Sequence, residues 1–334
     1  MLGALPPVFA GLEPRDAEEA SSFLQYVGLE AGEPLMVQGE DDLTLAFVTS
    51  GAVQLTVDDI PIGNVGARDM LGELELFGQM PRVASAVASG PVHLGVLAYD
   101  HYLHLCDRGN PAAFNLERHA MRRISDRLRW FDDSIMERSR GIAFEIDDRP
   151  PGFLKRLFQG RAPTIDVAGV LAESPLFDWA EGSLLHALAQ DFTVHRFPAG
   201  HVLARQGAVA EQMFVIASGR VDLVLVTGPQ SAEMLATLGR GQAVGEGSMA
   251  QHTPRSSTYV CRDEVVALRL DRAGYGGLFA SDDAVGSTFR QGILRNMIAL
   301  LLATQRRFLE LEASRHGRGE QTLRGTPVNA MWRD

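Results

Sequence analysis

The stretch AGEPLMVQGEDDLTLAFVTSGAVQL, residues 31–55, is repeated later in the chain as AGHVLARQGAVAEQMFVIASGRVDL, residues 199–223. The two stretches align without a gap and share nine identical residues, including a Gln-Gly pair and a Ser-Gly pair. A second pair of stretches, GELELFGQMPR at residues 72–82 and GEGSMAQHTPR at residues 245–255, shares its Gly-Glu and its Pro-Arg. An internal repeat of this length predicts two domains of the same fold.

A single insertion accounts for the difference in spacing between the two repeats. The first pair of stretches lies 168 residues apart (31 to 199), and the second pair lies 173 residues apart (72 to 245). The five extra residues fall near TGPQS, residues 227–231, where a turn-rich segment lets a hairpin lengthen at small cost. Chance does not readily reproduce glycine, glutamate, proline and arginine at fixed separations. We therefore expect that one domain was duplicated within the chain.

The hydrophobic pattern predicts an α+β fold, with two β-roll or jelly-roll domains that are each flanked by helices. The Ser-Gly pairs at 50–51 and 218–219 are typical of tight hairpins, because glycine accepts a positive φ. Strands are expected at residues 45–49, 52–57, 92–97, 213–217, 220–226 and 265–270. Helices are expected at residues 112–138, 182–191 and 287–314.

The repeat and the proline content also predict the domain boundaries. We expect a first domain over residues 1–145, a linker over 146–170, a second domain over 171–315 and a flexible tail over 316–334. Within the linker, Pro150-Pro151 and Pro163 prevent a regular helix from running through them, although one short helix at 153–158 fits between them.

The bulk composition excludes several classes of function. The chain has 334 residues, 46% of them hydrophobic, and a formal net charge of -11, which argues against a broad basic face for nucleic acid. Cys106 and Cys261 lie far apart and outside any Cys/His cluster, so no metal site is expected. Neither a signal peptide nor a membrane span is apparent. We therefore expect a cytoplasmic protein that has neither DNA nor a membrane as a partner.

The segments 72–82 and 245–255, here called the first and second motifs, contain the residues that we expect to bind a ligand. In each, a strand should end at Gly-Glu, followed by a short turn of helix and then Pro-Arg. This order places free backbone N–H groups of a helix start beside a guanidinium, and that combination binds a phosphate monoanion. The glutamate, nine residues before the arginine, is able to accept a hydrogen bond from a ribose hydroxyl.

On these residues the chain resembles the cyclic nucleotide-binding domains of the cyclic-AMP-dependent kinase regulatory subunits and of the catabolite activator proteins. Their phosphate-binding segment reads roughly Phe-Gly-Glu-x-(Ala/Ser), a short apolar stretch, and then an optional Pro before Arg-(Ala/Ser/Thr)-(Ala/Ser). This chain has LGELELFGQMPRVAS at residues 71–85 and VGEGSMAQHTPRSS at residues 244–257. The resemblance extends over about residues 10–140 and 170–313, and it implies a cyclic nucleotide, cyclic AMP or cyclic GMP, as the ligand.

The resemblance also implies a role for each matching residue. Glu246 would bind the ribose 2′-hydroxyl and Arg255 would pair with the cyclic phosphate. Ser248 would offer a hydroxyl and a backbone N–H to the phosphate, Gly245 would allow close approach, and Ser256 would contact the phosphate or the base. In the first motif the corresponding ligand-binding residues are Gly72, Glu73 and Arg82.

The first motif departs from the family pattern at two positions. Glu75 stands where the family usually has alanine or serine, and its carboxylate would repel a phosphate unless it turned to solvent. Val83 replaces a small polar residue. Each arginine has an alternative role as half of a structural Arg–Glu pair, and each motif glutamate as a helix cap.

The apolar residues of the long helices have two alternative roles, as a lid over the ligand or as a packing surface. In this family the helix after the roll closes over the base, and Trp130, Phe131 and Phe308 are candidates for such a lid. An apolar stripe at helical spacing is more often a core or a dimer seam than a lid, so residues 297–308 also predict a possible homodimer through the C-terminal helix.

Two functional hypotheses follow. In the first, the chain is a cyclic nucleotide receptor that signals to a protein effector of unknown identity and has no DNA-binding or catalytic domain of its own. No GxSxG, HExxH, P-loop or kinase signature occurs, so no catalytic residue is assigned and no enzyme is expected. In the second, the chain is a structural adaptor or dimerisation protein whose domains have lost the ligand.

Overall fold

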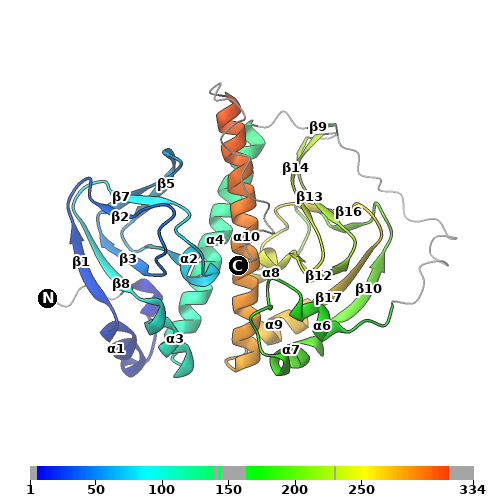
Figure 1. The fold of residues 1–334 in the computed structure, drawn as a ribbon, viewed down its shortest axis with the longest axis horizontal. Helices are drawn as coiled ribbons and strands as arrows, with labels where there is room; N and C mark the ends of the chain where they lie inside the picture. Colours follow the sequence, from blue (N-terminus) through cyan, green and yellow to red (C-terminus); the bar gives the residue numbers. More distant parts are fainter. Residues whose placement is uncertain (1–5, 139–141, 144–162, 229–230, 316–334) are drawn as a thin grey trace. The chain divides into compact units, whose positions relative to one another are not determined.

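The computed structural model describes residues 6–138, 142–143, 163–228 and 231–315. By packing, the chain divides into two compact units, Met1–Ala120 and Met121–Asp334. Each unit holds one β roll (Figure 1). The predicted tail and the predicted short helix at 153–158 lie outside the described residues.

The first unit begins with a short 3-10 helix, Pro7–Phe9, and then forms a roll of two four-stranded antiparallel sheets in the strand orders β1-β8-β3-β6 and β2-β7-β4-β5. The strands are β1 (Gln25–Leu29), β2 (Pro34–Met36), β3 (Leu45–Ser50), β4 (Ala52–Val57), β5 (Ile60–Gly66), β6 (Met70–Leu71), β7 (Ser85–Ala88) and β8 (Val92–Leu97). The helices are α1 (Pro14–Ser22), α2 (Glu73–Gly78), α3 (Tyr99–Asp107) and α4 (Pro111–Arg138), and α4 continues beyond this unit.

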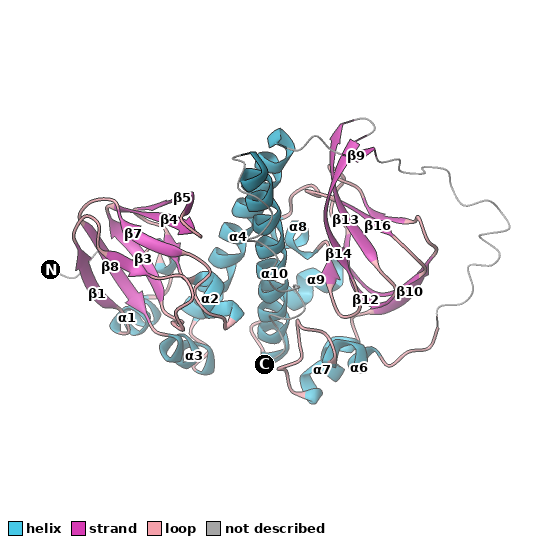
Figure 2. Ribbon diagram, turned by 45° about the horizontal axis from the view of Figure 1, so that its top comes forward, coloured by secondary structure: helices cyan, strands magenta, loops and turns pink. Residues whose placement is uncertain are grey.

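The second unit repeats this topology and adds one strand, β9, at the edge of one sheet. Its sheets have the strand orders β10-β17-β12-β15 and β11-β16-β13-β14-β9. The strands are β9 (Ile142–Ala143), β10 (Thr193–Phe197), β11 (Val202–Ala204), β12 (Gln212–Ser218), β13 (Val221–Gly228), β14 (Ser231–Leu238), β15 (Ala243–Val244), β16 (Thr258–Cys261) and β17 (Val265–Asp271). The helices are α6 (Val167–Ala172), α7 (Gly182–Ala189), α8 (Glu246–Gln251), α9 (Arg272–Ala280) and α10 (Ala284–Arg315). Figure 2 separates these helices from the strands by colour.

The predicted fold class, strands and long helices are therefore confirmed, and so is the placement of the insertion. The insertion falls in the β13–β14 hairpin, whose strands have eight residues each and so are three residues longer in total than β4, with six, and β5, with seven. The two Ser-Gly hairpins have glycine at the positive φ values that the sequence predicts, 83° at Gly51 and 87° at Gly219.

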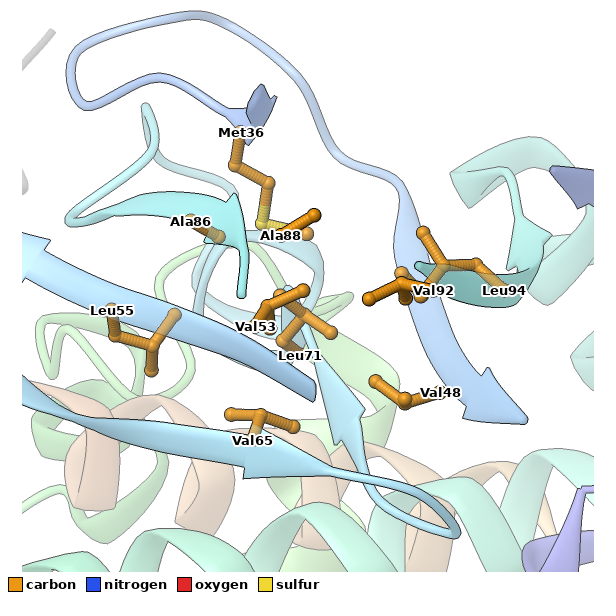
Figure 3. Packing of buried hydrophobic residues seen from close by; sticks show 11 residues of the cluster. Met36, Val48, Val53, Leu55, Val65, Leu71, Ala86, Ala88, Val92 and Leu94 are labelled. Atoms are coloured by element: carbon orange, nitrogen blue, oxygen red, sulfur yellow. The ribbon is translucent and has the colours of Figure 1, made fainter. Parts of the chain in front are cut away.

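The core of each roll lies between its two sheets. Figure 3 shows the first core, where Val53, Val92 and Leu94 are fully buried among the inward-facing residues of both sheets. In the second core Phe214, Ile216 and Leu223 have the same role. Hydrophobic packing across each roll holds in place the strands that precede the two motifs. Each motif therefore begins at a rigid strand.

The region before the second roll contains a helix where the sequence predicts linker. α6 starts at Val167, and the side chain of Asp166 caps it by accepting a hydrogen bond from the backbone N–H of Gly169 at 3.0 Å. Val170 and Leu171 are buried on its inner face. The predicted boundaries at 145 and 171 describe the duplicated unit and stay a prediction, because the division by packing follows contacts and falls within α4.

Candidate functional site

The second motif is built on the short helix α8 and on the glycine that precedes it. Gly245 is the N-cap residue of α8 and has a φ of 85°. A Cβ atom at this position would lie 2.4 Å from Nη1 of Arg255. Glycine is therefore required here, because the guanidinium packs against the backbone where any other side chain would begin. The close approach that the sequence predicts for Gly245 is, in the structure, the approach of Arg255.

Arg255 lies at the end of the same motif and is buried, with 4% of its surface exposed. Its Nη1 donates to the carbonyl oxygen of Gly245 and its Nη2 donates to that of Gln212. Burial lowers the pKa of this arginine, and the neighbouring Tyr259 and Glu246 oppose that effect. The guanidinium is thus held in place by neutral carbonyl groups. Among the described residues, no carboxylate forms an ion pair with it.

Glu246, the first residue of α8, is the most deeply buried charged group of the motif, at 1% exposure. Its Oε1 accepts a hydrogen bond of 2.7 Å from Nδ2 of Asn296 on α10. Its Oε2 is buried and has no hydrogen-bond partner among the described residues. Burial raises the pKa of this carboxyl group, while Asn296 and Arg255 counteract the rise. A buried acceptor of this kind is costly unless a donor reaches it.

Two serines belong to the predicted second site: Ser248 lies within the motif and Ser256 directly follows it. Ser248 is half-buried, and its hydroxyl donates to the carbonyl oxygen of Pro254 at 3.4 Å. Ser256 is exposed, and its hydroxyl donates to the carboxylate of Asp132 on α4. Of the five residues predicted for the second site, Gly245, Glu246 and Ser248 lie at the N-terminal turn of α8, whereas Arg255 ends the motif and Ser256 directly follows it.

Asp132 was not among the predicted site residues. Its carboxyl group is buried, at 6% exposure, and burial raises its pKa to about 7 despite the hydrogen bond from Ser256. The sequence does contain one signal for this role. Asp132 falls four residues after Leu128, on the otherwise apolar side of the helix, where a carboxylate needs a polar partner.

A small cavity of about 40 Å³ lies at the second motif. Its walls come from the motif residues together with α4 and α10, and Tyr259 also lines it. From α4 the lining residues are Ser125, Leu128 and Arg129, and from α10 they are Met297 and Leu300. All of these α4 residues belong to the second unit.

A larger cavity of about 590 Å³ adjoins the small one. It lies between α10 and the segment formed by β14 and the loop after it, and Tyr259 and Leu300 line both cavities. Asn296, which holds Glu246, lines it as well. The apolar part of its wall consists of Leu235, Ala236, Leu238, Ala243, Ala299 and Ala303.

The first motif has the same backbone but different partners for its arginine. Gly72 is the N-cap of α2, with a φ of 91°, and a Cβ there would lie 2.7 Å from Nη1 of Arg82. Arg82 is buried, and its Nη2 donates to the carboxylate of Asp42 at 2.6 Å and to the carbonyl oxygen of Thr44 at 2.9 Å. Its Nη1 lies 3.3 Å from Oε2 of Glu75.

Glu75 does not turn to solvent. Only 4% of its surface is exposed, and its Oε1 accepts a hydrogen bond of 2.9 Å from the backbone N–H of Val83. Burial acts against ionisation of Asp42, yet the hydrogen bonds from Arg82 and Thr44 hold the pKa of Asp42 below its ordinary value. Two carboxylates therefore share one guanidinium, and Glu73 is fully buried beside them on α2. The alternative of a structural Arg–Glu pair is realised in the first motif.

The aromatic residues that the sequence offers as lids form a cluster of their own. Phe308 of α10 packs against Trp130 at 5.4 Å and against Phe131 at 5.3 Å between ring centroids. None of the three lines either cavity of the second unit. Met297, Leu301 and Phe308 are buried within the chain, so α4 covers part of the helix face that motivates a homodimer.

No helix among the described residues is long and apolar enough to span a membrane. The same residues contain no group of three or more His, Cys, Asp or Glu side chains placed to hold a metal ion.

Several known proteins and solved structures are similar to this chain. The chain is 29% identical over 221 residues to the cyclic AMP receptor protein of Thermus thermophilus, covering 62% of this chain and 96% of that protein. It is 22% identical over 268 residues to the cAMP-dependent protein kinase regulatory subunit of Yarrowia lipolytica, covering 80% of this chain but 57% of that protein. Among solved structures, the regulatory domain of Toxoplasma gondii PKA with cAMP matches at 18% identity and a TM-score of 0.32, covering 82% of this chain and 88% of that one.

The family described as cyclic nucleotide-binding domain matches twice, at residues 26–108 and 194–282. These two segments contain both motifs and, apart from β9, nearly all of the two rolls, and together they make up about half of the chain. The chain belongs to the cyclic nucleotide-binding domain family and carries two copies of that domain in tandem.

Proposed function

We propose that this protein is a cyclic nucleotide receptor whose second domain binds the ligand. The phosphate lies against the N-terminal turn of α8, where Arg255 pairs with it and Ser248 contributes a hydroxyl and a backbone N–H. Glu246 accepts a hydrogen bond from the ribose 2′-hydroxyl, and Ser256 contacts the phosphate or the base. Gly245 leaves room for the guanidinium.

The observation that carries this proposal is the unpartnered Oε2 of Glu246. It is buried beside a cavity and beside an arginine whose hydrogen-bond partners are neutral carbonyls. A ligand that brings a hydroxyl donor and an anion at once satisfies both groups. A cyclic nucleotide has this combination, because its ribose hydroxyl lies next to the ring phosphate.

The larger cavity is the natural place for the base. It has about 590 Å³ of space, it adjoins the motif through Tyr259 and Leu300, and a large part of its wall is apolar. The cavity at the motif itself, at about 40 Å³, is too small for a nucleotide. Binding therefore requires α4 or α10 to move away from α8, and such a movement is what an effector protein would detect.

We further propose the cellular setting of this receptor. The protein acts in the cytoplasm through an effector protein, without an enzymatic or DNA-binding activity of its own. The adaptor hypothesis applies to the first domain, where Asp42 and Glu75 occupy the guanidinium of Arg82. A homodimer through α10 remains a prediction, and it would have to use the part of α10 that α4 leaves uncovered.

Isothermal titration calorimetry of the full chain with cyclic AMP and with cyclic GMP tests the proposal. We expect heat of binding from at least one of them, with loss of that heat in Arg255→Ala. Because Arg255 is buried and bonded to two carbonyls, we also expect Arg255→Ala to lower the melting temperature, and Arg255→Lys serves as the milder variant. A folded wild-type protein that gives no heat with either nucleotide at high micromolar concentration would refute the proposal.

A further inference from the structure

The two motifs differ in what surrounds the arginine, although the arginine itself is placed alike. In each domain the guanidinium donates to a backbone carbonyl at the start of the third strand, Thr44 in the first domain and Gln212 in the second. In each, a Cβ on the motif glycine would collide with Nη1. The repeat offset pairs Glu75 with Ser248 and Asp42 with Ala210. The arginine-binding frame is therefore shared, and the acidic side chains are the difference.

Glu75 engages the groups that would otherwise bind an anion. Its Oε2 lies 3.3 Å from Nη1 of Arg82 and its Oε1 accepts from the backbone N–H of Val83 at 2.9 Å. A guanidinium and a backbone N–H directly after it are the donors expected to hold two phosphate oxygens. A carboxylate has two acceptor oxygens in one plane, so it satisfies both donors at once.

The charge balance at Arg82 also opposes an incoming anion. Arg82 contributes one positive charge, whereas Asp42 and Glu75 contribute two negative charges in direct contact with it. Glu75 is buried, so solvent screens its charge little. A phosphate monoanion would have to displace a carboxylate that is already bonded, or lie next to two like charges.

From these contacts, and resting on the proposed function, we infer that Glu75 is a built-in substitute for the cyclic phosphate. It closes the first site, with Asp42 as the second counterion, and so it decides which of the two domains takes the ligand. The first domain then holds its arginine in the paired state at all times, and the protein binds one cyclic nucleotide per chain.

A reciprocal exchange between the two motifs tests this inference. The double variant Asp42→Ala/Glu75→Ser gives the first motif the residues of the second, and Ser248→Glu gives the second motif the residue of the first. With cyclic AMP and cyclic GMP in calorimetry, we expect one site per chain in the wild type, two in the double variant and none in Ser248→Glu. The triple variant, which combines all three changes, should bind one nucleotide through the first site.

Several results would overturn the inference. They are two sites in the wild type, a site that survives in Ser248→Glu, and a double variant that keeps the wild-type circular dichroism but gains no site. If the double variant does not fold, the comparison of the wild type with Ser248→Glu still decides whether the first site is closed.

A second probe separates this inference from the proposed function. Inorganic phosphate is used in a thermal shift measurement on Ser248→Glu and on the triple variant. We expect a rise in melting temperature in the triple variant alone, because only there is Arg82 released from both carboxylates. No nucleotide binding by any variant, together with this phosphate effect, refutes the receptor function but supports the role of Glu75. Absence of the phosphate effect in the folded triple variant refutes the role of Glu75.

Discussion

Asp132, on the long helix α4, accepts a hydrogen bond from the hydroxyl of Ser256, the residue directly after the arginine of the second motif. The carboxyl group of Asp132 is buried, and burial raises its pKa to about 7. The helix that follows the first roll therefore brings an acidic group to Ser256, the residue that we propose contacts the phosphate or the base of the ligand. A ligand phosphate bound at Ser256 would be repelled by an ionised Asp132.

This contact predicts a pH-dependent affinity. Asp132 is neutral below its pKa of about 7 and charged above it, and Asp133 and Tyr259 interact with it electrostatically. We expect wild-type affinity for the nucleotide to rise roughly tenfold as pH falls from 8 to 6, since the repulsion disappears. Calorimetry of Asp132→Asn should show affinity that is higher at pH 8 and flat across this range. Asp133→Asn, an exposed neighbour, should keep the pH dependence; equal slopes in wild type and Asp132→Asn would contradict the prediction.

The same raised pKa predicts how the stability of the unliganded protein changes with pH. The pKa of Asp132 is about 7 in the folded chain and the ordinary value for aspartate is 3.8. Between these values the folded state holds a proton that the unfolded state has lost, so the free energy of unfolding falls as pH rises, by roughly 4 kcal/mol at most. Urea denaturation at pH 5 and pH 8 measures the fall. Asp132→Asn should reduce it, and Glu246, whose pKa is also raised, should account for a remaining part.

Replacement of Glu246 separates its role in binding from its role in folding. Glu246→Gln removes a buried charge while keeping the shape, so the melting temperature should stay unchanged or rise. Nucleotide affinity should fall by roughly 10- to 100-fold, because the bond to the ribose hydroxyl is weakened. A ligand without the 2′-hydroxyl provides the control: it should bind the wild type weakly and Glu246→Gln with little further loss. Additive losses would show that Glu246 acts elsewhere.

Gly245→Ala tests the geometry of the glycine and the arginine. The substitution places a Cβ 2.4 Å from Nη1 of Arg255 at a φ of 85°. We expect a loss of at least about 2 kcal/mol in the free energy of unfolding and loss of nucleotide binding. Gly247→Ala, two residues further on, is the matched control, because its Cβ would meet only Met297 at 3.7 Å. Urea denaturation curves of the two variants should differ clearly; similar curves would contradict the reading of Gly245.

Glu75→Gln tests how far the first motif depends on its ion pair. The variant leaves Arg82 buried with Asp42 as its remaining counterion. We expect a loss of about 1–3 kcal/mol in the free energy of unfolding, since a buried charge loses one partner. Ser248→Ala at the matching position of the second motif should change stability by less than about 0.5 kcal/mol, because the hydroxyl of that serine donates to a neutral carbonyl, that of Pro254. Thermal or urea denaturation of both variants makes the comparison.

Much of this fold could be predicted from the sequence. The two sets of Gly-Glu and Pro-Arg, the Ser-Gly hairpins and the five-residue insertion identify a duplication, and the structure confirms it strand by strand. Local rules are enough for these features. A hairpin needs a residue of positive φ, and a strand needs alternating burial, and both are visible within a few residues of sequence.

The acidic partners of Arg82 and of Ser256 could not be predicted in the same way. Asp42 lies 40 residues before Arg82, and Asp132 lies more than 120 residues before Ser256, so no local pattern joins them. The sequence determined that the chain holds two copies of one nucleotide-binding frame. The tertiary structure decided that one arginine is neutralised by carboxylates and the other is held by carbonyls. Electrostatic pairing depends on distance in space, and only the packed chain sets that distance.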